Sequence, residues 1–211
     1  MSSPLLSVRN LSVTFTTAGH TVEAVRDVSL TLDRGETVAL VGESGSGKSV
    51  TALSILQLLP YPVAQHGPES SIRFDGSELI GAKPALLQSV RGGRIAMVFQ
   101  EPMTSLNPLH TLEKQITETL FLHKRMNAGA ARARTLELLR LVGLPDAERR
   151  LDAYPHQLSG GQRQRVMIAM ALANEPDILI ADEPTTALDV TIQAQILKLL
   201  KELQQIGRAH V

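Results

Sequence analysis

Residues 42–49 read Gly42-Glu43-Ser44-Gly45-Ser46-Gly47-Lys48-Ser49, and this stretch decides the fold class. The apolar, β-prone run 37–41 before it predicts a strand, and residues 46–59 after it predict a helix that Pro60 and Pro62 end. Glycines allow the backbone to curl, so that successive N–H groups and the helix N-terminus face one anion. Strand, glycine loop and helix in this order predict a phosphate-binding loop in an α/β fold.

Side chains in and directly after this loop offer further ligands. Lys48 is expected to reach the β- and γ-phosphates of a nucleotide and to act in catalysis, and Ser49 is expected to ligate Mg²⁺. The other positions expected to hold the nucleotide are Gly42, Ser44, Gly45, Gly47 and Val50. The alternative is a glycine-rich turn without a ligand, which the flanking strand and helix disfavour.

An apolar run that closes on two acids lies further along the chain, and it reads Ile178-Leu179-Ile180-Ala181-Asp182-Glu183. Asp182 ends the strand predicted at 177–181, where its carboxylate can hold Mg²⁺ or a ligating water. Glu183 is the candidate base that polarises an attacking water. Asp-Glu-Pro after a strand is usually only a turn, and the phosphate loop in the same chain is what favours the catalytic interpretation.

Two residues at strand ends each have two interpretations. Gln100 ends the strand predicted at 95–99 and lies 52 residues after Lys48 (100 − 48). Its amide could contact Mg²⁺ and the attacking water. The alternative is a surface residue without a functional role. Phe15 ends the first predicted strand. It could stack on adenine, or it could be the inward aromatic residue of an alternating strand.

A second glycine-rich sequence, Leu158-Ser159-Gly160-Gly161-Gln162, stands at the start of another predicted helix. Its serine hydroxyl and unbonded N–H groups can also face an anion. The alternative is a helix cap with no ligand. One nucleotide needs only one such loop, so the second indicates a chain that completes its site with another copy or a close relative.

Composition narrows the possible partners. Basic and acidic residues are equal in number at 21 each, so the chain has no overall positive field for nucleic acid, and we expect no nucleic-acid partner. The absence of cysteine excludes disulfides and thiolate metal sites. No apolar run approaches the roughly 20 residues of a membrane helix, so membrane association is expected to come through a partner.

The polarity pattern predicts the remaining elements. Strands are expected at 11–16, 22–32, 71–74 and 95–99, with a turn near Gly19. Helices are expected at 111–125, 128–142, 161–174 and 190–205. The last helix should bury Ile192, Ile196, Leu199, Leu200 and Leu203. Arg163 and Arg165 are expected on a solvated helix face rather than in contact with nucleic acid.

These elements predict an α/β P-loop NTPase with a mostly parallel core sheet, an N-terminal antiparallel β subdomain and an inserted helical subdomain. We expect residues 1–211 to form one domain. Its ATP-binding core would comprise about 5–110 and 175–206, and its helical subdomain about 111–174.

The motifs, in order and spacing, resemble the ATP-binding cassette ATPases from about Leu5 to Gln204, including Ala187-Leu188-Asp189 after the acid pair. Longer matches are similar to the importer ATPases for oligopeptides, dipeptides, nickel and microcin C. These matches are residues 41–51, Phe99 to Pro108, Tyr154-Pro155-His156-Gln157, and Ala181 to Val190.

The resemblance implies ATP and Mg²⁺ as ligands and two cassettes stacked head to tail. Ser159, Gly160, Gly161 and Gln162 would cap the γ-phosphate held by the other cassette, and Asp189 would lie at the interface. It further implies transmembrane permease subunits, driven through the Gln100 region and the helical insertion, and an indirect extracytoplasmic solute-binding protein. The chain would then work as a peripheral protein at the cytoplasmic face of the inner membrane.

The family carries a further histidine after another strand, and only 28 residues follow Glu183 here (211 − 183). We therefore expect a piece of a longer ATPase that hydrolyses ATP poorly alone. Two rival functions stay open at this point. One is a cassette ATPase acting on nucleic acid or ribosomes, which should show a long coiled coil, zinc cysteines or a basic surface. The other is a nucleotide-binding module without turnover.

Overall fold

The computed structural model describes residues 3–99, 105–184 and 190–205 of the 211-residue chain. The chain divides into two compact units, Met1–Val90 and Arg91–Val211, which we call unit 1 and unit 2. In the described ranges, none of the helices combines the length and the apolar character that crossing a bilayer would require.

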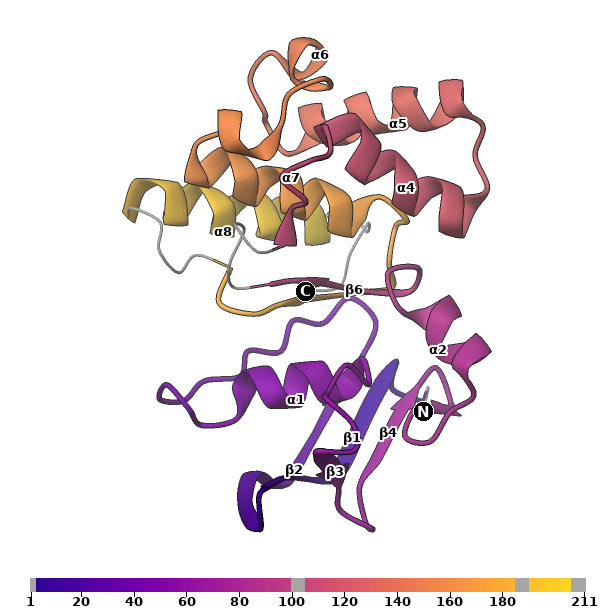
Figure 1. Cartoon of the computed structure of the whole chain (residues 1–211), viewed down its shortest axis with the longest axis vertical. Coiled ribbons are helices and arrows are strands. Elements are labelled where there is room, and N and C mark those ends of the chain that lie inside the picture. Colours follow the sequence, from indigo (N-terminus) through magenta and orange to yellow (C-terminus); the bar gives the residue numbers. More distant parts are fainter. Residues whose placement is uncertain (1–2, 100–104, 185–189, 206–211) are drawn as a thin grey trace. The chain divides into compact units, whose positions relative to one another are not determined.

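Unit 1 is built on an antiparallel sheet (Figure 1). Its two long strands, β1 (Leu6–Thr17) and β2 (His20–Leu32), form a hairpin that turns at Ala18 and Gly19, both with positive φ. This confirms the predicted hairpin and its turn. The shorter strands are β3 (Ala64–His66), β4 (Ser71–Phe74) and β5 (Ser77–Glu78), in the sheet order β2-β1-β4-β5 with β3 also on β1. The sheet buries Leu11, Val13, Ile72 and Phe74.

Two helices accompany this sheet, α1 (Lys48–Ile55) and α2 (Pro84–Val90), and the second was not predicted. The predicted helix 46–59 is shorter in the structure. It ends before Pro60 because Gln57 takes a left-handed conformation with φ of 53° and its side-chain amide donates to the Ser54 carbonyl at 2.6 Å. A left-handed residue breaks the helical bond pattern as effectively as a proline does.

The strand predicted at 37–41 was wrong, because these residues have no regular secondary structure. Val38 and Leu40 are exposed, and Val41 is 93% exposed. A β-prone run becomes a strand only when its N–H and C=O groups pair with a neighbouring strand. Among the described residues, no strand pairing involves this run.

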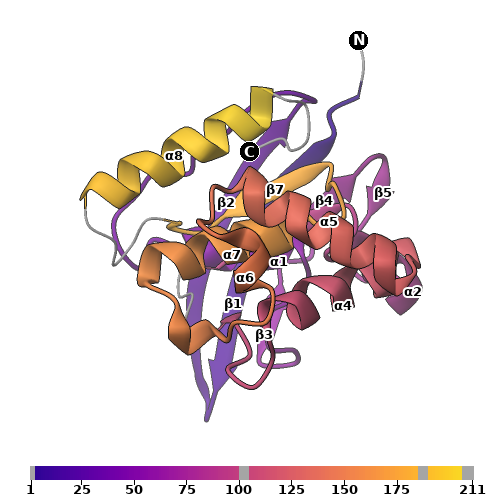
Figure 2. The same cartoon turned by 90° about the horizontal axis from the view of Figure 1, so that it is seen from above.

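Unit 2 contains a parallel strand pair with helices gathered on one side of it (Figure 1). Strand β6 (Ile95–Val98) pairs with β7 (Ile178–Ala181), as the continuous apolar runs indicated. The main helices are α4 (Leu112–Lys124), α5 (Ala128–Leu141), α7 (Gly160–Leu172) and α8 (Val190–Gln205), all close to the predicted ranges. Shorter turns are α6 (Ala147–Arg150) and the 3₁₀ helix Pro155–Gln157. Figure 2 shows the helices from above.

One apolar cluster holds unit 2 together. Its members come from both strands and all four long helices, and they include Val98, Leu179, Ile116, Leu138, Ile168, Ile196, Leu199 and Leu200. Ile192 packs against the cluster while only partly buried. The predicted inner face of α8 is confirmed for Ile196, Leu199 and Leu200, and the Leu203 side chain lies outside the described part.

Candidate functional site

The glycine loop of unit 1 is closed by its own lysine. The Lys48 ammonium group donates hydrogen bonds to the carbonyl oxygens of Gly42, at 3.0 Å, and Glu43, at 2.9 Å. The Ser46 N–H also donates to the Glu43 carbonyl, at 3.2 Å. The positive charge therefore lies inside the curl of the loop, at the position from which it can meet an anion held by the backbone.

Gly47 is required by both conformation and space. Its φ is +89°, and a Cβ atom added to it would lie 2.5 Å from the Ala24 carbonyl oxygen and 3.1 Å from Val25 Cγ2. The loop therefore rests directly on the backbone of β2. Gly45 has φ of +79° with no atom within 4 Å of such a Cβ, so conformation alone favours glycine there.

Helix α1 begins at the end of this loop. Its N-cap residue is Gly47, which has no side chain to bond the N–H groups of the first turn. Ser49 and Val50, in that turn, are half-buried, and the Thr51 hydroxyl donates to the Gly47 carbonyl at 3.0 Å. The loop, the lysine and the helix N-terminus thus form the arrangement that favours a phosphate group.

Phe15 lies elsewhere on the same sheet. It is half-buried in β1, where it pairs with Val22 of β2 on one side and Ala64 of β3 on the other. A half-buried ring fits a core aromatic and a partly exposed stacking surface equally well, so the role of Phe15 in nucleotide binding stays a prediction.

The acid pair of unit 2 follows the parallel strands. The Asp182 N–H donates to the Val98 carbonyl at 3.0 Å, which extends the β6–β7 pairing to the first acid. Glu183 then takes a left-handed conformation with φ of 46°. This conformation costs a non-glycine residue about 1 kcal/mol or more. Eight other non-glycine residues of the described chain share it, so it does not by itself mark a functional site. Gln100 and Asp189 lie outside the described residues.

The second glycine sequence begins α7 as predicted. Ser159 is the N-cap: its hydroxyl accepts from the Gln162 N–H at 3.3 Å, and its own N–H donates to Gln162 Oε1 at 3.0 Å. This reciprocal pair is a capping box. The structure therefore shows the helix cap, and whether the turn also binds an anion stays a prediction. The cap holds the serine and the N–H groups of Gly160 and Gly161 at one turn. We call residues 158–162 the signature turn.

The expectation that Arg163 and Arg165 lie on a solvated helix face was wrong. Both are half-buried, and Arg163 Nε donates to the Pro155 carbonyl at 2.8 Å. Arg165 donates to the Val142 carbonyl at 2.5 Å and to Gln195 Oε1 at 2.9 Å, so it joins the end of α5 to α7 and α8. A guanidinium group carries enough N–H donors to bond several acceptors at once. The sequence around these arginines does not show which carbonyl groups the fold brings within their reach.

The predicted site residues fall into two groups. Unit 1 carries the phosphate loop and Phe15, and unit 2 carries the acid pair and the signature turn on different elements. Sequence reasoning missed Ala24 and Val25, the backbone and side chain that support Gly47. Nothing in the alternation of β2 distinguishes them from other strand residues.

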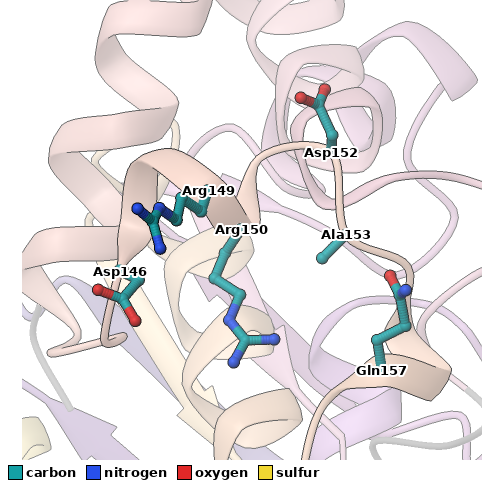
Figure 3. A pocket seen from close by; sticks show the side chains of 6 residues that line it. All are labelled: Asp146, Arg149, Arg150, Asp152, Ala153 and Gln157. Carbon is teal, nitrogen blue, oxygen red and sulfur yellow. The ribbon is translucent and has the colours of Figure 1, made fainter.

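A pocket of about 450 Å³ lies in unit 2, and its lining differs from every predicted site residue (Figure 3). The lining residues are Asp146, Arg149, Arg150, Asp152, Ala153 and Gln157. Figure 3 shows the Arg149 side chain on the side of Asp146 and the Arg150 side chain running in a different direction. Two guanidinium groups are balanced by two carboxylates, so the pocket offers no net positive charge for phosphates.

Residues 25–186 match the family model described as "ABC transporter". The chain belongs to the ABC transporter family. The match spans the phosphate loop, the signature turn and the acid pair, so the resemblance inferred from these motifs is confirmed.

The curated relatives are named as transport proteins. The chain is 64% identical over 203 residues to the peptidoglycan transport ATP-binding protein YejF of Agrobacterium fabrum, covering 96% of this chain and 37% of that protein. It is 55% identical over 201 residues to the oligopeptide transport ATP-binding protein OppD of Bacillus subtilis, covering 95% of this chain and 56% of that protein. The chain thus spans about half, or less, of the length of these relatives.

Solved structures of cassettes share the fold. The post-hydrolysis dimer of the ATP-binding cassette MJ0796, bound to ADP and Pi, matches with a TM-score of 0.84 and 34% identity over 98% of this chain and 86% of that one. The predicted α/β P-loop class, with its antiparallel N-terminal sheet and helical layer, is confirmed by this similarity.

Proposed function

We propose that this chain binds ATP with Mg²⁺ in the loop Gly42–Ser49 and hydrolyses it to energise the import of peptides or peptide-like solutes. The observation that carries the proposal is the closed loop itself. Lys48 bonds two loop carbonyls while Gly47 fixes the loop on β2. When a triphosphate binds, the lysine would exchange these carbonyls for phosphate oxygens, and the N–H groups of the α1 first turn would bond the same anion.

The residues present fit a nucleotide-bound Mg²⁺. Ser49 offers a hydroxyl and Asp182 a carboxylate, the oxygen donors that this ion prefers, and Gln100 would add an amide oxygen. Bound Mg²⁺ neutralises the charge that develops on the phosphates. Glu183 would accept a proton from the attacking water, since it directly follows Asp182 at the end of β7.

The proposed active form is a dimer of cassettes. In it the signature turn of one protomer, with Ser159 and Gly161 presented by the capping box, would cap the nucleotide of the other, and Asp189 would lie between them. A solved relative is described as dimeric and bound to ADP and Pi, which supports this assembly. The partner cassette could be an identical chain or a relative.

The transport role rests on the relatives. Their names specify peptidoglycan and oligopeptide transport. We therefore propose permease subunits as partners at the cytoplasmic face of the inner membrane, with a solute-binding protein acting indirectly. The solute class is peptides, and microcin C belongs to it as one peptide-like candidate.

Calorimetry with Mg²⁺–ATP tests the binding step. The full chain should bind ATP, and Lys48→Ala should lower the affinity by about a hundredfold or more, because it removes the charge inside the loop. Lys83→Ala is the matched control: Lys83 is exposed in the same unit, and this variant should bind like the unsubstituted chain. Equal ATP affinities for the Lys48→Ala variant and the control would refute the site assignment.

Uptake of a labelled peptide tests the transport step. Proteoliposomes that contain the chain, its partner cassette and the permeases should accumulate a labelled tetrapeptide only with ATP on the side of the cassettes. ATP hydrolysis that no peptide stimulates, together with no accumulation, would leave an ATPase but refute the peptide-import assignment.

A further inference from the structure

The signature turn touches α8 at its second glycine. A Cβ atom added to Gly161 would lie 2.9 Å from Ile192 Cγ2, and 3.6 and 3.7 Å from Ile192 Cδ1 and Cγ1. Carbon atoms in packed interiors do not approach so closely, so no side chain fits between the two. The branched methyl of Ile192 therefore lies directly against the backbone of the turn.

Further contacts align the two helices one turn later. Arg165 lies four residues after Gly161 and donates to Gln195 Oε1, three residues after Ile192, at 2.9 Å. Beyond these, Ile196 of α8 is buried in the same apolar cluster as Val166 of α7. A steric contact and a hydrogen bond thus hold the start of α7 beside the start of α8.

Helix α8 is also tied to the acid pair through the chain. It begins at Val190, seven residues after Glu183 (190 − 183). Ile192 thus belongs to the first turn of this helix.

We propose that Ile192 is a positioning residue: its Cγ2 methyl sets the place of the signature turn. The inference rests on the proposed function, in which the acid pair serves the hydrolysis of one nucleotide and the signature turn caps another.

Two aliphatic substitutions separate this role from bulk packing. Ile192→Val keeps the Cγ2 methyl and loses Cδ1, whereas Ile192→Leu keeps the volume and loses the branch at Cβ. In the full chain we expect kcat of the Val variant within about twofold of the unsubstituted protein and kcat of the Leu variant about tenfold lower, with KM for ATP unchanged in both. A purely structural role predicts the reverse order, because Leu fills the core better than Val.

A double substitution tests the contact itself. Gly161→Ala should lower kcat by about a hundredfold, since its Cβ meets Ile192 Cγ2. Adding Ile192→Leu, which removes that atom, should restore at least about tenfold of the lost rate. If Gly161→Ala is equally inactive beside Ile192 and beside Leu, the glycine is needed for another reason and the inference is overturned.

Leu197→Ala serves as the control for truncating an aliphatic residue on α8, because Leu197 is 55% exposed. It should leave kcat within about twofold. All rates are measured with the partner cassette present, and an unsubstituted chain that does not hydrolyse ATP under these conditions overturns the proposed function and this inference with it. An active chain in which the Val and Leu variants have equal kcat overturns the inference alone.

Discussion

The carbonyl oxygen of Ala24 lies 2.5 Å from the place that a Cβ atom would take on Gly47. The phosphate loop is therefore supported by the backbone of β2, at a residue 23 positions before Gly47 in the chain (47 − 24). A backbone carbonyl cannot rotate away as a side chain can, so a Cβ atom at position 47 would force the loop or the strand to move.

Gly47→Ala should destabilise unit 1 by about 3 kcal/mol, because it adds the clash with Ala24 to the strain of a φ of +89°. Gly45→Ala, with φ of +79° and open space around the added Cβ, should cost only about 1 kcal/mol. The free energy of unfolding from urea titration measures both. Equal losses for the two variants would mean that the approach to Ala24 does not limit the loop.

Glu78 should make the stability of unit 1 depend on pH. Burial raises the pKa of Glu78, but hydrogen bonds from the Ser71 hydroxyl and the N–H groups of Ile72 and Ile80, with Arg73 nearby, together lower this pKa below its ordinary value. A carboxyl whose pKa is lowered by folding contributes stability above its unfolded pKa and loses it as the pH falls through the folded pKa.

Glu78→Gln should therefore cost about 1 kcal/mol at pH 7, an estimate that allows for the partial exposure of the side chain. The difference between variant and unsubstituted chain should shrink as the pH falls and vanish below the lowered pKa of Glu78. Urea titrations at several pH values measure it, with the exposed Glu69→Gln as control. A difference that stays constant with pH would show that the carboxylate charge plays no part.

The sequence predicted those parts of the fold whose own periodicity carries the signal. Helix α8 was placed at its observed bounds because Ile196, Leu199 and Leu200 recur at helical spacing. The β1–β2 hairpin was found from alternation and one glycine turn. The loop was recognised from a short motif with its local context, whereas the acid pair and the signature turn were assigned because the loop occurs in the same chain.

Contacts between distant segments could not be read in this way. The run 37–41 has the composition of a strand, but a strand also needs a partner, which composition does not specify. The sequence pattern also does not predict the left-handed conformation of Gln57 or the bonds of Arg165 to Val142 and Gln195. These features depend on where other elements place their carbonyl groups. The site motifs were predictable, and the atoms that support them were not.

Arg165→Lys should destabilise unit 2 although it keeps the charge. A single ammonium group cannot reach both the Val142 carbonyl and Gln195 Oε1, which the two ends of the guanidinium bond at 2.5 and 2.9 Å. We expect a loss of about 1–2 kcal/mol in the free energy of unfolding. Arg149→Lys, at an exposed arginine of the same unit, should change it by less than about 0.5 kcal/mol. Equal effects would assign Arg165 to the surface after all.

Two substitutions of Glu183 should separate its conformation from its chemistry. Glu183→Gln keeps the side-chain size and the strained φ of 46° but removes the base, so ATP should still bind while hydrolysis falls by about a hundredfold or more. Glu183→Gly removes the base and also the strain, so hydrolysis should fall equally while the free energy of unfolding rises by about 1 kcal/mol.

Steady-state ATPase assays and urea titrations on the same preparations give both quantities. Asp177→Asn, before β7, controls for loss of a carboxylate in this segment: its ion pair with Arg94 at 2.7 Å is half-exposed, and the variant should keep the ATPase rate. A Glu183→Gln variant that hydrolyses ATP at the normal rate would remove Glu183 as the base. If the Glu183→Gly variant is no more stable than Glu183→Gln, the left-handed conformation of residue 183 is not strained in its surroundings. Glycine raises the free energy of unfolding at this position only when it removes strain.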